Sequence, residues 1–276
     1  MNSIAICAPA TPITPDVAEA VSRIAQADFP QMELDFHPQC FRSQGHFAGS
    51  EEERLGAFLD CANDPAFDAV WFAKGGYGSN VIAARAIEGL SAVGRGKTFL
   101  GYSDNGYLLA GLYRAHAGTA VHGPMPIDVR REGGESAVRR ALEFLGGDSS
   151  GGIEPSLDER PAVAFNLMTL AMLTGTDLMP NLAGHVVMVE EVAEHLYAID
   201  RLFFHVTHNL KGIAGLRLGQ VSAVPENDRA FGCDEEEIAR YWCKRSGIEY
   251  LGRAEIGHFS ANRIVPFGVA RKPEDA

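Results

Sequence analysis

The stretch AVWFAKGGYG, residues 69–78, joins a short apolar run to a loop that contains three glycines. A continuous apolar run of this length is typical of a strand buried on both faces of a parallel sheet. The glycines let the backbone turn sharply where the strand ends. Apolar residues at helical spacing then predict a helix from about Asn80 to Leu90. The stretch therefore predicts one strand-turn-helix unit.

The segments on either side repeat this unit. Upstream, residues 3–8 and 32–36 are predicted strands, Thr14-Pro15 is a helix start, and Ser50 to Glu53 form a capping box before another helix. Downstream, strands at 98–102 and 119–121 precede predicted helices at about 105–115 and 136–145. Repetition of such units predicts a mostly parallel sheet with helices on both faces.

A run of small and polar residues, 146–152 (GGDSSGG), is typical of a linker. We expect an N-terminal α/β domain over 1–145, a linker over 146–155 and a C-terminal domain over 156–276. The second half predicts helices at 166–173, 199–210 and 234–246, strands at 186–189 and 216–224, and a last apolar stretch ending at 264–266. Because strands and helices do not alternate regularly there, we expect an α+β domain.

Composition limits the classes of partner. The 276 residues include 24 Lys and Arg against 36 Asp and Glu, a formal net charge of −12 that disfavours nucleic acid. Five widely spaced cysteines without a C-x-x-C favour neither disulfides nor a zinc knuckle and indicate a reducing compartment. With no signal-like N-terminus and no apolar run of ~20 residues, we expect a cytoplasmic protein without membrane contact.

Ligands of open parallel sheets bind beyond the carboxyl ends of the strands, which singles out loops 74–78, 102–104 and 122–125. The glycine loop lacks the third glycine of a dinucleotide fingerprint. A tight turn between strand and helix explains the glycines as well as a ligand-binding loop does. The GRGKT segment at 94–98 lacks the first glycine of a P-loop and precedes a strand, so we reject it.

Ser103 follows a predicted strand and precedes a helix, a place where a serine can be exposed as a nucleophile. The plainer alternative is a helix N-cap. Among nine histidines, His258 lies in a turn-rich stretch suited to a base, and either Glu190 or Glu191 could orient it. No H-E-x-x-H is present, so the motif of zinc peptidases is excluded.

Taken together, these segments resemble the LD-carboxypeptidase family, which comprises muramoyltetrapeptide carboxypeptidases and the related microcin self-immunity peptidases. The matching blocks occur in the family's order: IAICAPA, AGSEEER, KGGYG, GYSD, HGPM, NLMTLAMLTGT, VVMVEEVAEHLYAIDR and GHFSANRIVPFG. The resemblance implies an N-terminal flavodoxin-like domain, an active site at the domain interface, a homodimer, and neither cofactor nor metal.

The resemblance also implies a catalytic triad of Ser103, Glu190 and His258. The backbone N–H groups of Asp104 and of Gly75 or Gly76 would then form the oxyanion hole. In the matching loops, Lys74, Tyr77, His122 and Met125 are expected to contact substrate. The family usually has arginine where this chain has Lys74, and a lysine offers a point charge instead of a planar fork.

The implied reaction releases the terminal D-alanine of the murein tetrapeptide during peptidoglycan recycling. One alternative is a detoxifying peptidase that acts on peptidyl- or aminoacyl-nucleotides, although neither Trp71 nor Trp242 is an obvious shelf for a base. Another is a non-catalytic two-domain binding protein. Because strand side chains alternate, only one of Glu190 and Glu191 should face the cleft. The family match selects Glu190, and Glu191 is expected to be an exposed or helix-capping carboxylate whose replacement is nearly silent.

Overall fold

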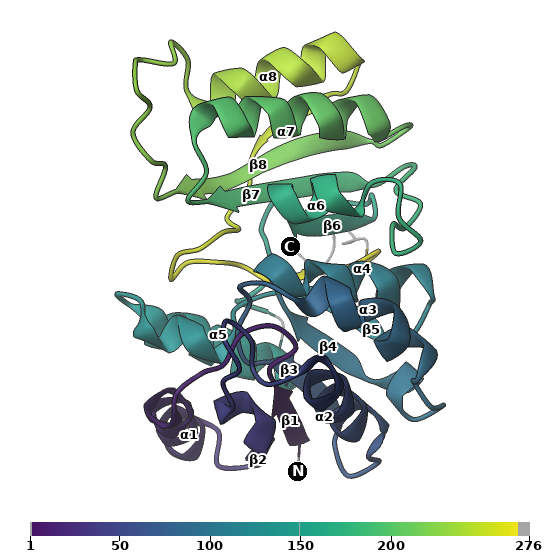
Figure 1. Cartoon of the computed structure of the whole chain (residues 1–276), viewed down its shortest axis with the longest axis vertical. Coiled ribbons are helices and arrows are strands. Elements are labelled where there is room, and N and C mark those ends of the chain that lie inside the picture. Colours follow the sequence, from purple (N-terminus) through teal and green to yellow (C-terminus); the bar gives the residue numbers. More distant parts are fainter. Residues whose placement is uncertain (1, 149, 270–276) are drawn as a thin grey trace.

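The computed structural model describes residues 2–148 and 150–269, so Ser149 of the predicted linker lies outside the described residues. Two sheets lie one above the other, with the chain passing from the lower to the upper one after helix α5 (Gly134–Leu145) (Figure 1). The mixed α/β class expected from the sequence is confirmed.

The first sheet has six strands in the order β10-β5-β4-β3-β1-β2. Five of them are parallel and follow the flavodoxin-like order, as expected, and β10 is antiparallel to β5. The strands are β1 (Asn2–Cys7), β2 (Met32–Phe36), β3 (Ala69–Phe72), β4 (Thr98–Gly101), β5 (Thr119–His122) and β10 (Val265–Pro266).

Helices cover both faces of this sheet. Those on one face are α1 (Pro15–Asp28) and α5, and those on the other are α2 (Glu51–Asn63), α3 (Ser79–Glu88) and α4 (Gly106–Arg114). Pro15 stands in the first turn of α1 with Thr14 as its N-cap. Ser50 Oγ accepts the Glu53 N–H while the Glu53 carboxylate accepts the Ser50 N–H, so the predicted capping box is confirmed.

The second sheet is more regular than expected. Its four parallel strands, in the order β6-β7-β8-β9, alternate with helices along the chain. The elements are β6 (Ala162–Asn166), α6 (Leu167–Leu173), β7 (Val186–Val192), α7 (Leu196–Asn209), β8 (Gly215–Ser222), α8 (Glu235–Ser246) and β9 (Tyr250–Arg253). The expected lack of alternation was wrong because β6 and β9 were not foreseen. Alanines dilute the strand signal of β6, and Gly252 weakens that of β9.

A shared apolar core joins the two sheets. Leu108 and Leu109 of α4 belong to the same buried cluster as Phe165 of β6 and Leu170 of α6. The chain then returns to the first sheet, where Val265 of β10 pairs with His122 of β5. The segment between β9 and β10, which carries His258, is therefore anchored to one sheet at each end. Over the described residues, no helix is long and apolar enough to cross a membrane.

A cluster of three phenylalanines packs between α2 and the strands β3 and β4. The ring of Phe99 on β4 lies 5.8 Å from that of Phe58 on α2 and 6.5 Å from that of Phe72 on β3, and all three are fully buried. Phe99→Ala should lower the free energy of unfolding by about 3–5 kcal/mol, because it leaves a cavity in this buried cluster. Urea denaturation measures this loss. Val81→Ala, at an exposed position of α3, is the control and should change stability by less than about 0.5 kcal/mol. Equal effects in the two variants would contradict the prediction.

Candidate active site

Three loops follow β3, β4 and β5 and converge at one edge of the first sheet. Asn105, which follows the second loop, ties the other two together. Its Nδ2 donates to the carbonyl oxygen of Lys74 at 3.1 Å and to Sδ of Met125 at 3.2 Å. The loops at 74–78, 102–104 and 122–125 therefore meet, as the carboxyl ends of parallel strands should.

Ser103 stands in a constrained turn between β4 and α4. Its φ is +60°, a left-handed conformation that costs a non-glycine residue free energy. A Cβ on Gly75 would lie only 2.9 Å from Cβ of Ser103 and 3.0 Å from its Oγ, so the glycine is needed for the serine to stand there. Helix α4 begins at Gly106 with Asn105 as its N-cap, so the N-cap interpretation of Ser103 was wrong.

Asp104 links the serine turn to the glycine loop. Its buried carboxylate accepts the N–H of Ser79 at 2.8 Å, and the Ser79 hydroxyl donates to its carbonyl oxygen at 2.6 Å. Burial raises the pKa of Asp104, although the hydrogen bonds from Ser79 and Gly78 and the charge of Arg54 oppose this. Two hydrogen bonds therefore join the first turn of α3 to the serine turn.

His258 and Glu190 form a buried pair. Nδ1 of His258 lies 2.7 Å from Oε2 of Glu190, and the Glu190 side chain is fully buried. Burial alone would lower the pKa of His258, but the charge of Glu190 and its hydrogen bond outweigh burial and raise the pKa above its ordinary value. The pair has the arrangement of a general base and its orienting carboxylate, with the Nε2 atom left for another partner.

A bulge in the second sheet makes room for Glu190. Val189 pairs with Leu218 and Glu191 pairs with Val221, so Glu190 lies opposite two residues of β8. One of these is Gly219, where a Cβ would lie 2.6 Å from the Ile256 carbonyl oxygen and 3.0 Å from Cβ of Glu190. Glycine at this position therefore lets the His258 segment approach β8.

Glu191 is also buried, which differs from the expected exposed position. Its carboxylate accepts hydrogen bonds from Asn166 Nδ2 at 2.7 Å, Met168 N–H at 2.9 Å and Val192 N–H at 2.9 Å. Burial and the charge of Glu190 raise its pKa to about 7, even though these hydrogen bonds oppose the shift. The capping role expected for Glu191 is confirmed, because Met168 lies in the first turn of α6. Only one of the two glutamates borders the pocket, as strand alternation predicts, but it is Glu191, while Glu190 contacts His258.

A pocket of about 500 Å³ brings the predicted nucleophile and base together. Its wall contains the glycine loop, the serine turn, the start of α6, the end of β7 and His258. The lining residues are Gly76, Tyr77, Ser103, Asp104, Tyr107, Asn166, Met168, Thr169, Met172, Glu191, Val192, Ala193, Glu194 and His258. Among the described residues, Ser103 and His258 do not hydrogen bond to each other in this structure. In enzymes without substrate this contact is often long.

Two residues expected to contact substrate lie in the interior. His122 is 1% exposed, and its Nε2 lies 3.1 Å from Oδ1 of Asn262. Met125 is 2% exposed and accepts the Asn105 hydrogen bond. The prediction of direct contact fails for both in this structure, because β10 and the Asn262 segment cover the end of β5. Neither side chain borders the pocket.

The other two expected contacts differ from each other. Tyr77 is 67% exposed and lines the pocket, with its ring 5.2 Å from that of His46. Lys74 is half-buried and stands outside the pocket wall, where only its backbone carbonyl takes part in the site. The departure from the family arginine therefore falls on a position that does not border the cavity.

Sequence reasoning missed the part of the wall that the second sheet contributes. Asn166 ends β6, and Met168, Thr169 and Met172 lie in α6. The rule that ligands bind at strand ends would have identified Asn166 if β6 had been predicted. Tyr107 and Glu194 carry no comparable signal.

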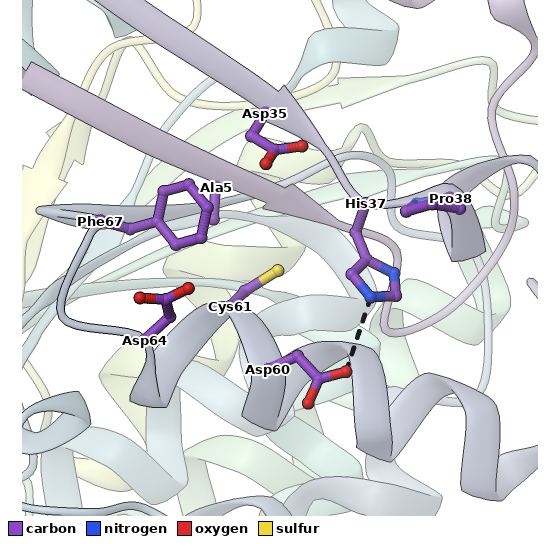
Figure 2. Close-up of a pocket in the computed structure, with 8 residues that line it drawn as sticks. All are labelled: Ala5, Asp35, His37, Pro38, Asp60, Cys61, Asp64 and Phe67. Carbon is purple, nitrogen blue, oxygen red and sulfur yellow. Dashed lines mark ion pairs between the residues drawn. The ribbon is translucent and has the colours of Figure 1, made fainter.

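A smaller cavity of about 210 Å³ lies elsewhere, between the β1–β2 edge and α2 (Figure 2). Nε2 of His37 lies 3.6 Å from Oδ2 of Asp60 at this cavity, and Cys61 also lines it. None of the predicted site residues borders this cavity. Within residues 2–148 and 150–269, no cluster of three or more His, Cys, Asp or Glu side chains is placed to hold a metal ion.

Both halves of the chain match domain models of a known family. The model of the LD-carboxypeptidase N-terminal domain matches residues 4–123, and that of the C-terminal domain matches residues 161–272. A murein tetrapeptide carboxypeptidase of Pseudomonas aeruginosa is 27% identical to this chain over an alignment 295 residues long. The alignment covers 96% of this chain and 91% of that protein.

Solved structures share the fold. The muramoyltetrapeptide carboxypeptidase of Oxalobacter formigenes superposes with a TM-score of 0.79 at 22% identity, over 97% of this chain and 93% of that one. The microcin C7 self immunity protein MccF, in complex with aspartyl sulfamoyl adenosine, superposes with a TM-score of 0.79 at 18% identity, over 97% of this chain and 91% of that one. Since the two domain models match most of the chain in the expected order, the chain belongs to the LD-carboxypeptidase family.

Proposed function

We propose that this serine-type carboxypeptidase releases the terminal D-alanine from a murein tetrapeptide, with Ser103 as nucleophile, His258 as base and Glu190 as the orienting carboxylate. The observation that carries the proposal is the buried Glu190–His258 pair, whose histidine lies on the wall of the pocket that contains Ser103. The name of the Pseudomonas aeruginosa relative supports the substrate class.

In the proposed reaction, Ser103 Oγ attacks the carbonyl carbon of the scissile bond while His258 accepts the hydroxyl proton. Glu190 holds the imidazole in the tautomer with a proton on Nδ1 and stabilises the imidazolium that forms. The imidazolium then protonates the departing amine of D-alanine. Water, deprotonated by the same histidine, hydrolyses the acyl-enzyme and restores the serine.

The oxyanion would be held by backbone N–H groups at the serine turn and the glycine loop. Thr11 Oγ1 donates to the carbonyl oxygen of Gly75 at 2.5 Å. In a trans peptide the C=O and N–H point in opposite directions, so this bond directs the Gly76 N–H away from Thr11. Because Gly76 borders the pocket, we favour its N–H over that of Gly75 as the partner of the Asp104 N–H. Each such donor typically lowers the barrier by ~2.7–4 kcal/mol.

The finer expectations belong to the same proposal. A substrate of the cell-wall recycling pathway fits a cytoplasmic location, and the chain would act as a homodimer on a small peptide, without nucleic acid or membrane. The domain division with a linker at 146–155 also stays a proposal. A nucleotide-linked substrate is the less favoured alternative. Trp71 is buried with its Nε1 bonded to the Pro124 carbonyl, and Trp242 lies within α8 with its Nε1 bonded to Asp200 of α7.

Ser103→Ala should reduce kcat on murein tetrapeptide to background, because it removes the Oγ atom that attacks the scissile carbonyl and gives its proton to His258. A fluorophosphonate probe should label the wild type and not this variant, and mass spectrometry of the released alanine gives the rate. Ser22→Ala on α1 is the control and should keep both signals. A wild-type chain that resists the probe would favour the non-catalytic binding protein.

The rate should depend on pH through His258. A base must be neutral to accept the serine proton, so kcat/KM should fall as the pH drops through a pKa above the ordinary value of ~6.5. His122 does not contribute, since burial lowers its pKa to about 4. Initial rates from about pH 5.5 to 8.5 test this, and a flat profile over that range would exclude His258 as the base.

Glu190→Gln should lower kcat at least about a hundredfold with KM within about threefold, because the amide keeps the volume but loses the charge that stabilises the imidazolium. Glu88→Gln, at an exposed position of α3, is the control for a charge change alone. Steady-state kinetics on both variants decide the role, and a loss below about tenfold in Glu190→Gln would remove Glu190 from the triad.

A further inference from the structure

A second buried glutamate lies next to the triad carboxylate and has other partners. Glu191 is 2% exposed and borders the pocket, whereas Glu190 contacts His258. Oε1 of Glu191 accepts from Asn166 and from the Val192 N–H, and its Oε2 accepts from the Met168 N–H. Three donors from β6, α6 and β7 therefore converge on one carboxylate.

Glu191 also determines how Asn166 presents its side chain. Oδ1 of Asn166 accepts the Thr169 N–H at 3.0 Å, and its Nδ2 donates to Glu191 at 2.7 Å. Because the Thr169 N–H can only donate and the Glu191 carboxylate can only accept, these two hydrogen bonds form in only one orientation of the Asn166 amide. Nδ2 carries two hydrogens, and only one of them is donated to Glu191. Because Asn166 borders the pocket, its second N–H remains for a hydrogen bond to a ligand.

We propose that Glu191 is a positioning residue for substrate binding, which holds Asn166 and the first turn of α6 as one wall of the pocket. This role rests on the proposed function, because it takes the pocket to be where the peptide binds. Glu191 acts through Asn166 and the helix backbone and does not touch the reacting atoms. Its effect should therefore fall on KM, whereas the effect of Glu190 falls on kcat.

Glutamine cannot replace this carboxylate. All three partners are donors, and a glutamine has one oxygen and one NH₂ group. If its oxygen serves Asn166 and Val192, its NH₂ group faces the Met168 N–H, which then loses its acceptor. A buried donor without an acceptor is costly, so the start of α6 must shift. Glu191→Asp keeps the charge but is one methylene shorter, so it should show a smaller effect of the same kind.

The experiment measures binding and turnover separately. Murein tetrapeptide is titrated calorimetrically into Ser103→Ala with and without Glu191→Gln, and steady-state kinetics are measured for Glu191→Gln and Glu191→Asp. We expect Kd and KM to rise about ten- to a hundredfold in Glu191→Gln with kcat within about threefold, and less in Glu191→Asp. Asp234→Ala removes the carboxylate cap of α8 and is the matched control. It should lower the thermal midpoint without changing KM.

Two results would overturn the role of Glu191. Unchanged Kd and KM with only a lower thermal midpoint would make it a purely structural cap like Asp234. A hundredfold loss of kcat with KM intact would place it in the chemistry. If Glu191→Gln does not fold, an unchanged KM in Glu191→Asp overturns the proposal. Failure of the proposed function is distinguishable, because wild-type and Ser103→Ala chains would then neither hydrolyse nor bind the tetrapeptide.

Discussion

The hydrogen bond between His258 and Glu190 depends on most of the structure. A carboxylate that is fully removed from water is costly unless a partner compensates its charge. Oε1 of Glu190 is buried without a hydrogen-bond partner among the described residues, so the imidazole is its main compensation. The same electrostatics favour the protonated imidazole, which is the form that the base takes during the reaction.

Holding this pair requires both sheets. Glu190 comes from β7, where the bulge opposite Gly219 admits the His258 segment. That segment is attached at one end to β9 of the second sheet and at the other to β10, which pairs with β5 of the first. The return of the chain to the first sheet therefore brings the His258 segment to the sheet that carries Ser103.

The proposed nucleophile is held by contacts of a different kind. Ser103 occupies a left-handed turn, and strained turns persist only where their surroundings determine them. Gly75 leaves the space, Asn105 bonds to both neighbouring loops, and Asp104 joins the turn to the start of α3. The shared core beneath α4 and α6 then keeps this turn facing the second sheet. The acyl transfer proposed for Ser103 and His258 requires both side chains to be held in a defined relative position.

The sequence by itself determined the local elements and the loops that carry chemistry. The apolar run 69–73, the capping box at Ser50 and the order of the βα units are local signals, and propensity and periodicity act over a few residues. Ser103 and His258 could be selected because both stand in loops, but their meeting in one pocket could not be derived from spacing. Only the tertiary structure decided that Glu190 and Glu191 are both buried, that the buried His122 and Met125 do not border the pocket and that Asn166 does. The reason is physical: burial, a bulge and the pairing of β10 with β5 depend on residues far apart in the chain, and no local pattern records them.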